Sequence, residues 1–450
     1  MSQFWSETKK GVAYPPIQAK TVHNDRARSM PTRVTEMLGI EYVVAQRRAP
    51  PRRLAACPAV LFLPSRRKRT AAKLLAQRYL PLLHLTGRVP LRYPIVMGGM
   101  TGVGTPELAA AMTAAGGLGV FAIHNAGGRD DEEMIENGRA WIRKAKELCG
   151  DKPFGVNLTI LPAAKPPPYE GFVDMIVEEG VPVLETAGSG GGQLAAIVEK
   201  AKSAGIICIH KCTSVRHALS AEKYGVDILS VDGFECAGHP GRDDVGNLVL
   251  LASASKQLSI PFIASGGVAT GAQLAACIAL GADGVNLGTR VCITQECIWP
   301  DEYKQRAVES TELDTIVINR KLGDPTRFYR NTPLIEAGAV EDSKLEGEFK
   351  IEDIFHIIAG AIWSLFPSFC HFFHQSFHHF VTCSIIFSSG TRGREAEKNG
   401  DPDGGQWSAG QSVGLINDVP TVENLVQEFI WDAYDTFDSR LANILGGARL

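Results

Sequence analysis

Short apolar runs alternate with longer segments of helical spacing between residues 94 and 290. Runs of strand length occur at 95–99, 118–122, 154–158, 182–186, 206–210, 227–231, 261–265 and 283–287. Helical stretches lie between them, including Pro106–Ala114, Glu132–Glu147, Ala195–Ala204, Ser214–Tyr224, Leu248–Gln257 and Ala272–Leu280. Alternating strands and helices predict a parallel sheet with right-handed crossovers. Eight such units favour an α/β TIM (β/α)8 barrel, and a doubly wound open sheet is the alternative.

Polar residues and glycines follow the predicted strands. In a barrel of this kind the active site lies at the carboxyl ends of the strands, so these positions are expected to form it. In chain order they are Gly98-Gly99-Met100, His124-Asn125, Asn157, Glu185-Thr186, Lys211, Asp232 through His239, Gly266-Gly267 and Gly288-Thr289.

Glycine turns end the seventh and eighth predicted strands, at Ser265-Gly266-Gly267 and at Gly288-Thr289. Loops at these places, with a short helix N-terminus, bind phosphate in many barrels, because glycine lets backbone N–H groups approach an anion closely. We therefore predict a phosphate site, and tight turns alone are the alternative. Lys211 would add a positive charge near the anionic part of a cofactor.

The loop Asp232–Asp244 is long, polar and rich in glycine, and it carries His239 between Gly238 and Pro240. An imidazole there faces a ligand and can exchange a proton near neutral pH, because its unperturbed pKa is about 6.5. We predict that His239 is catalytic; a surface histidine is the alternative. Four other residues are given lesser roles, namely His124 as a weaker site candidate, Cys236 as structural, and His210 and His217 as packing residues.

Composition adds few constraints. The 450 residues have a formal net charge of −3, which gives no general attraction to nucleic acid or to an anionic membrane. Ten cysteines without a CxxC pair suit reduced thiols in a cytoplasmic enzyme and indicate no metal site. Residues 1–29 form a polar extension without the apolar stretch of a secretory signal. No membrane span is expected, and nothing indicates an oligomeric state.

Two segments differ in composition from the rest of the chain. Residues 43–93 contain twelve Lys or Arg and no acidic residue, which is compatible with a nuclear address, an RNA-binding arm or a foreign insertion. Residues 362–391 contain no charged residue and many Phe and His. Four histidines and a proline argue against a membrane span, and the spacing of His374 and His378 is only weak evidence for a metal pair.

Several blocks of sequence resemble the nitronate monooxygenase (2-nitropropane dioxygenase) family of FMN-dependent barrels, and within it the branch that includes bacterial NADH:quinone reductases. The blocks are PIVMGGM (94–100), FGVNLTILP (154–162), ETAG (185–188), IHKCTSVRHAL (209–219), DGFECAGHPG (232–241), IASGG (263–267), GADGVNLGTR (281–290) and GQWSAGQSVGLI (405–416).

The resemblance implies one non-covalent FMN and makes His239 the active-site histidine. The residues expected to contact FMN are Gly99, Met100, Thr101, Asn157, Lys211, Gly238, Gly266, Gly267, Gly288, Thr289 and Gln411. Family members commonly carry Gln at the position of Thr101, which is a departure here. The implied reaction is oxidation of an alkyl nitronate with O2 to a carbonyl compound and nitrite. The alternative is quinone reduction, with NADH as co-substrate.

The resemblance covers about residues 30–42, 94–361 and 392–435, and the two unusual segments interrupt it. We therefore predict a barrel unit over 30–361 that is interrupted by 43–93, a second insertion over 362–391, and a segment over 392–450 that completes the site. We hypothesise that both insertions are translated introns or recent acquisitions.

Other functional classes remain open at this point. One is a flavin-free phosphate-binding barrel, such as an isomerase or lyase. Another is a nucleic-acid-binding or scaffold protein that uses residues 43–93. A third is a chain whose two insertions prevent an active enzyme from forming.

The intron hypothesis predicts that the mature transcript lacks the codons for residues 43–93 and 362–391. Sequencing the transcript measures this directly. A mature message that carries both segments in frame would refute the hypothesis.

Overall fold

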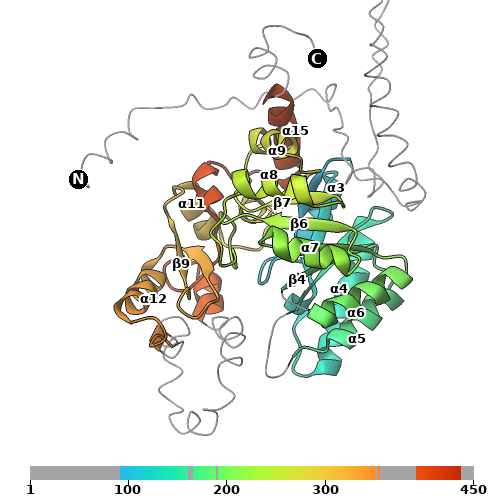
Figure 1. Cartoon of the computed structure of the whole chain (residues 1–450), viewed down its shortest axis with the longest axis horizontal. Helices are drawn as coiled ribbons and strands as arrows, with labels where there is room; N and C mark the ends of the chain where they lie inside the picture. The colour runs from blue at the N-terminus through green and yellow to red at the C-terminus, as the bar shows by residue number, and fades with distance from the viewer. Residues whose placement is uncertain (1–91, 161–165, 189–190, 351–352, 355–391, 437–450) are drawn as a thin grey trace, which may run out of the picture.

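A computed structural model describes residues 92–160, 166–188, 191–350, 353–354 and 392–436. Eight parallel strands form a closed barrel in chain order, so the predicted barrel is confirmed and the open sheet is excluded (Figure 1). β1 closes the barrel by pairing with β8, with Val96 opposite Asn286. The strands are β1 Ile95–Met97, β2 Leu118–Ala122, β3 Gly155–Ile160, β4 Val183–Gly188, β5 Ile207–Cys212, β6 Ile228–Asp232, β7 Phe262–Ser265 and β8 Val285–Leu287.

Helices follow the strands and surround the barrel. They are α3 Pro106–Ala114, η4 Ile123–Ala126, α4 Asp131–Cys149, α5 Tyr169–Glu178, α6 Gly191–Ser203, α7 Val215–Lys223, α8 Asn247–Gln257, α9 Gly271–Ala279 and α10 Thr289–Cys292. Local sequence sets several of their starts. The Thr105 side chain caps α3 ahead of Pro106, and Asp130 caps α4. Thr270 and Gln273 form a reciprocal capping box at α9.

The barrel interior is apolar toward the amino ends of the strands and polar toward their carboxyl ends, the upper end of the barrel. Its apolar cluster consists of Val96, Leu118, Val120, Val183, Ile209, Ile228 and Ile263. Two residues further along β4 and β5 the same face carries Glu185 and Lys211, because alternate residues of a strand share a face. The change in polarity along each strand therefore marks the carboxyl end of the barrel as the site.

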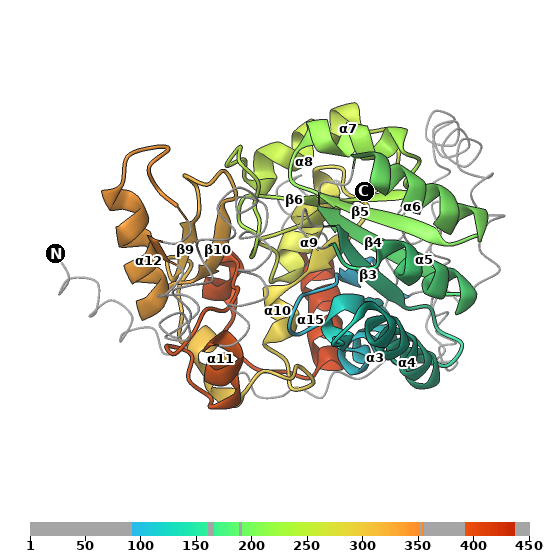
Figure 2. The ribbon, with the colours of Figure 1, turned by 90° about the horizontal axis from the view of Figure 1, so that it is seen from below.

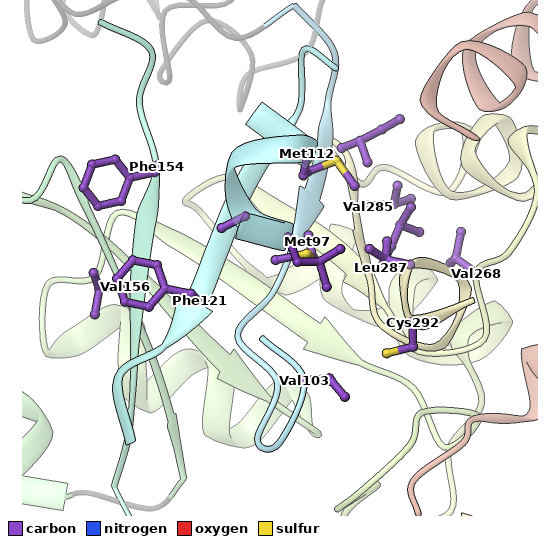
Figure 3. Close-up of a cluster of buried hydrophobic side chains, with 14 of the residues drawn as sticks. Met97, Val103, Met112, Phe121, Phe154, Val156, Val268, Val285, Leu287 and Cys292 are labelled. Atoms are coloured by element: carbon purple, nitrogen blue, oxygen red, sulfur yellow. The ribbon is translucent and has the colours of Figure 1, made fainter. Parts of the chain in front are cut away.

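The larger core lies between the strands and the surrounding helices. Figure 3 shows part of it, where Phe121 projects from β2, Phe154 immediately precedes β3, and Met97 lies near Leu287. The Phe121 and Phe154 rings stack with centroids 6.2 Å apart. Burial of this apolar layer holds the helices against the barrel. The loops, rather than the helices, surround the carboxyl ends of the strands.

A smaller subdomain lies beside the barrel in Figure 2. Its antiparallel hairpin joins β9 Thr315–Ile318 to β10 Thr326–Tyr329, and α12 Thr332–Ser343 packs on it. We predicted a mainly helical portion, so the hairpin is an addition to that prediction. α11 Asp301–Val308 and η7 Gln411–Leu415 adjoin it, and α15 Val422–Asp435 returns to pack against α9 and α3.

Some predictions fall outside the described residues, namely the extension 1–29, nearly all of the insertion 43–93, and all of the insertion 362–391. Among the described residues, no helix is long and apolar enough to cross a membrane. The seven described cysteines are all buried and free.

The packing of α15 can be tested with two aromatic residues of that helix. Phe429 is fully buried against the barrel, whereas Trp431 is 49% exposed. Phe429→Ala should lower the free energy of unfolding by about 3–5 kcal/mol, because it removes a buried ring and leaves a cavity. Trp431→Ala should change it by less than about 0.5 kcal/mol. Urea unfolding measures both values, and equal effects of the two variants would contradict this packing.

Candidate functional site

A buried polar network closes the upper end of the barrel interior. Glu185 on β4 is fully buried, and its Oε2 accepts hydrogen bonds from the Gly99 backbone N–H and from Asn157 Nδ2, both at 2.8 Å. Its Oε1 lies 3.3 Å from Asn286 Nδ2. Asn286 Oδ1 in turn accepts from the Gly98 N–H at 2.8 Å. One carboxylate therefore connects β1, β3, β4 and β8.

Lys211 on β5 brings a positive charge to this network. Its Nζ lies 3.5 Å from the Gly99 carbonyl oxygen. Burial disfavours the charged form of Lys211, but the nearby Glu185 and Asp232 carboxylates outweigh this and raise its pKa. Burial raises the pKa of Asp232 as well, while the Lys211 charge opposes that rise. Lys211 therefore stays protonated at neutral pH.

The loop after β1 lies directly on this network. A Cβ added at Gly99 would lie 2.1 Å from Asn157 Cβ, so only glycine fits there. The Asn125 side chain holds the rest of the loop by bonding the Met100 carbonyl at 2.9 Å and the Gly102 N–H at 2.9 Å. Thr101 is exposed. The predicted residues Gly99, Asn157 and Lys211 are thus brought together.

The turns after β7 and β8 present free backbone N–H groups. Gly266 and Gly267 have φ of +80° and +74°, a region that favours glycine. Within the described residues, the backbone amides of Gly266, Gly267, Gly288 and Thr289 donate no hydrogen bond. Several unpaired N–H groups beside glycines are what a phosphate requires.

The loop after β6 carries His239 and is held by the β9–β10 hairpin. Gly238 and Arg327 form a β-bridge, with N–H to oxygen distances of 3.0 Å and 2.6 Å. His239 is 44% exposed, and its Nε2 lies 3.6 Å from Asp324 Oδ2. The imidazole is therefore accessible and has a carboxylate beside it.

Side chains from the hairpin brace this loop. The Arg327 guanidinium donates to the Phe234 carbonyl at 3.1 Å and lies over the Phe234 ring. Arg320 forms an ion pair with Asp244 at 2.9 Å, and Arg242 Nε donates to the Gly323 carbonyl at 2.6 Å. The hairpin thus fixes the position of the His239 backbone.

The segment from 405 to 411 also reaches this loop. The Gln411 N–H donates to the Glu235 carbonyl at 3.0 Å, and the Gly410 N–H donates to Thr289 Oγ1 at 2.9 Å. Trp407 stacks on Tyr329 with ring centroids 4.1 Å apart. The predicted residues Gln411 and Thr289 therefore lie on neighbouring segments.

Three further histidines contact elements other than the loop after β6. His124 Nε2 lies 3.2 Å from the Thr159 carbonyl, its ring packs against Phe172, and burial lowers its pKa. His210 is buried, as we predicted, with Nδ1 2.9 Å from Thr186 Oγ1. His217 is exposed on α7, so our interpretation of it as a packing residue was wrong.

Cys236 is buried beside Gly266, and burial raises the pKa of its thiol. A thiol that is mostly protonated is a poor nucleophile, which agrees with a structural role. Among the described residues, no cluster of three or more His, Cys, Asp or Glu side chains is arranged to hold a metal ion. The pair His374 and His378 lies outside the described residues.

Sequence reasoning missed several residues that build the site. Asn286, Ser230, Asn247 and Asp324 were not singled out, although the first two alternate with apolar residues on their strands. Asn286 Nδ2 also lies 3.1 Å from Ser230 Oγ. The Asn247 side chain bonds the Ser265 carbonyl at 2.9 Å and so supports the turn after β7.

Polar residues and glycine turns surround the carboxyl ends of the barrel strands, a region called the barrel mouth. The fold and this polar mouth define a (β/α)8-barrel enzyme. The sequence profile of the nitronate monooxygenase family matches residues 84–432, and the chain belongs to that family. Its members and relatives are oxidoreductases, and this protein is one as well.

Two curated relatives are similar to this chain. A Rhodococcus jostii protein named (3aS,4S,5R,7aS)-5-hydroxy-7a-methyl-1-oxo-octahydro-1H-indene-4-carboxyl-CoA dehydrogenase is 32% identical, over 79% of this chain and 96% of its own length. A probable nitronate monooxygenase of Staphylococcus saprophyticus is 28% identical, over 55% of this chain and 78% of its own.

Two solved structures are also similar to this chain. FabK of Thermotoga maritima is similar with a TM-score of 0.61 and 28% identity, covering 81% of this chain and 98% of its own. The nitroalkane oxidase of Streptomyces ansochromogenes has a TM-score of 0.59 and 25% identity, covering 80% of this chain and 99% of its own.

The burial of His210 predicts a loss of stability in acid. Burial first, and the nearby His217 second, lower the pKa of His210 to about 4. Between pH 6.5 and 4 the unfolded chain therefore binds a proton that the folded protein does not. The free energy of unfolding should fall by up to about 3 kcal/mol over this window because of His210. In His210→Gln that contribution should vanish, and parallel pH profiles from urea unfolding of the two proteins would contradict it.

Proposed function

We propose that the protein is an FMN-dependent nitronate monooxygenase, which oxidises an alkyl nitronate with O2 to a carbonyl compound and nitrite. The observation that carries this proposal is the pairing, in one barrel mouth, of free glycine amides with an accessible histidine. Membership of the family, the staphylococcal relatives and the Streptomyces nitroalkane oxidase support the choice of substrate.

The residues present fit FMN. The amides of Gly266, Gly267, Gly288 and Thr289 would hold its phosphate, because each is a donor without an acceptor among the described residues. Asn157 and Lys211 would meet the flavin ring or its ribityl chain. Gly99 and Met100 would lie along the flavin, with Thr101, Gly238 and Gln411 completing the contacts. When bound, FMN supplies the electron acceptor.

His239 would manage the substrate's proton and position the substrate. A neutral imidazole can accept a proton from a nitroalkane, and the imidazolium can donate a hydrogen bond to the nitronate anion. Asp324 would stabilise the imidazolium, since its carboxylate lies 3.6 Å from Nε2. Lys211 stays cationic and would favour an anionic ligand in the mouth.

A second candidate is a dehydrogenase that acts on a coenzyme A thioester. The Rhodococcus relative favours it, because it is 32% identical to this chain over 96% of its own length. Quinone reduction with NADH remains the alternative that the resemblance of the sequence implies.

The test combines a spectrum with one substitution. Purified protein supplied with FMN should show flavin absorbance, and anaerobic addition of a nitronate should bleach it. His239→Asn should leave FMN affinity unchanged and slow nitronate turnover by about 10²- to 10⁴-fold, because proton transfer and positioning are lost. His217→Asn, at an exposed histidine on α7, should change neither value.

Three results would contradict the proposal. Unchanged turnover in His239→Asn would remove the histidine from the mechanism. Bleaching by an acyl-CoA thioester but not by nitronates would favour the second candidate. Rapid bleaching by NADH, without nitronate turnover, would favour the quinone reductase.

A further inference from the structure

Glu185 is a buried charge that the proposed chemistry does not use. Its side chain is fully enclosed, yet it is a carboxylate, which is costly to bury unless it is fully compensated. Three donors converge on it, namely the Gly99 N–H, Asn157 Nδ2 and Asn286 Nδ2, at 2.8, 2.8 and 3.3 Å. Glutamine would direct N–H groups at some of these donors, so the site requires an acceptor with two oxygens.

The groups that Glu185 holds are those that face the mouth. It fixes the Gly99 N–H at the start of the loop after β1. It also fixes the amide of Asn157, whose Oδ1 accepts from Thr159 Oγ1 at 2.9 Å. With both ends of that amide bonded, Asn157 has one orientation. Lys211 completes the arrangement, because its Nζ lies 3.5 Å from the Gly99 carbonyl and it interacts with the Glu185 charge.

We propose that Glu185 is a positioning residue for the cofactor: it orients the Gly99 loop and Asn157 against FMN, and its charge helps to set the reduction potential of FMN. This inference rests on the proposed function, since it requires FMN in the mouth. A negative charge near the cofactor opposes the addition of electrons and so lowers its potential. Removing that charge also leaves the Lys211 cation less compensated, which acts in the same direction.

The experiment compares Glu185→Gln, Glu185→Asp and Thr186→Val in the full chain supplied with FMN. The sequence pattern places Thr186 at the site together with Glu185, but the structure places its side chain on the outer face, where it is fully buried and bonded to His210. Thr186 is therefore the matched control on the same strand. FMN affinity is measured by fluorescence titration, the midpoint potential by spectroelectrochemistry, and stability by urea unfolding of the FMN-free protein.

Glu185→Gln should weaken FMN binding by about 10- to 100-fold and shift the midpoint potential to more positive values. Glu185→Asp keeps the charge on a shorter side chain, so its affinity should fall while its potential stays near the wild-type value. Thr186→Val should alter stability alone. If Glu185→Gln does not fold, Glu185→Asp still tests the proposal, because its FMN affinity should fall while its midpoint potential stays unchanged.

Two outcomes would overturn the proposal, and they are distinguishable. If the wild type binds FMN and Glu185→Gln shows the same affinity and potential, Glu185 is structural only and the proposed function stands. If the wild type binds no FMN, the proposed function fails and this inference fails with it.

Discussion

The hydrogen bonds to the buried carboxylate of Glu185 are the constraint on which the rest of the site depends. An ionised group inside a barrel is stable only if donors and an opposite charge surround it. Gly99, Asn157 and Asn286 supply the donors, and Lys211 supplies the charge. These residues come from strands that are distant in sequence, so the carboxylate fixes the relative positions of several strand ends. The arrangement of polar groups in the barrel mouth thus depends on the one buried charge of Glu185.

The second requirement is a fixed loop above the buried polar network around Glu185. His239 lies in a glycine-rich loop that would not hold one conformation by itself. The β9–β10 hairpin supplies the missing constraint through the bridge between Gly238 and Arg327. The segment around Gln411 adds a further contact at Glu235. An accessible histidine therefore lies above a rigid polar network. Proton transfer to or from a bound substrate requires such a fixed arrangement.

Much of the fold could be predicted from the sequence, because each barrel strand is a short apolar run and each helix has clear periodicity. The range predicted for α3, Pro106–Ala114, agrees with the structure because Thr105 and Pro106 mark its start locally. The hairpin could not be predicted in the same way. Its strands contain charged residues such as Arg327, and their role depends on contact with a loop almost ninety positions earlier in the chain.

The site was predictable where chemistry follows a strand directly, as at Lys211 and Gly266. It was not predictable where a polar residue lies within an apolar run. Asn286 is such a residue, and only its alternation with Val285 and Leu287 reveals that it points into the barrel. Asp324 could not be found either, because nothing in the local sequence brings it to His239. Contacts between distant segments, rather than local preference, account for both.

The central claim is that glycine amides after β7 and β8 hold the phosphate of a flavin in this mouth. Titrating the purified protein with FMN and, separately, with riboflavin tests it most directly, because the two ligands differ only in that phosphate. Tight FMN binding with riboflavin at least about 100-fold weaker is the predicted result, since several charge-assisted hydrogen bonds are lost. Equal affinities, or no binding of either ligand, would contradict the account.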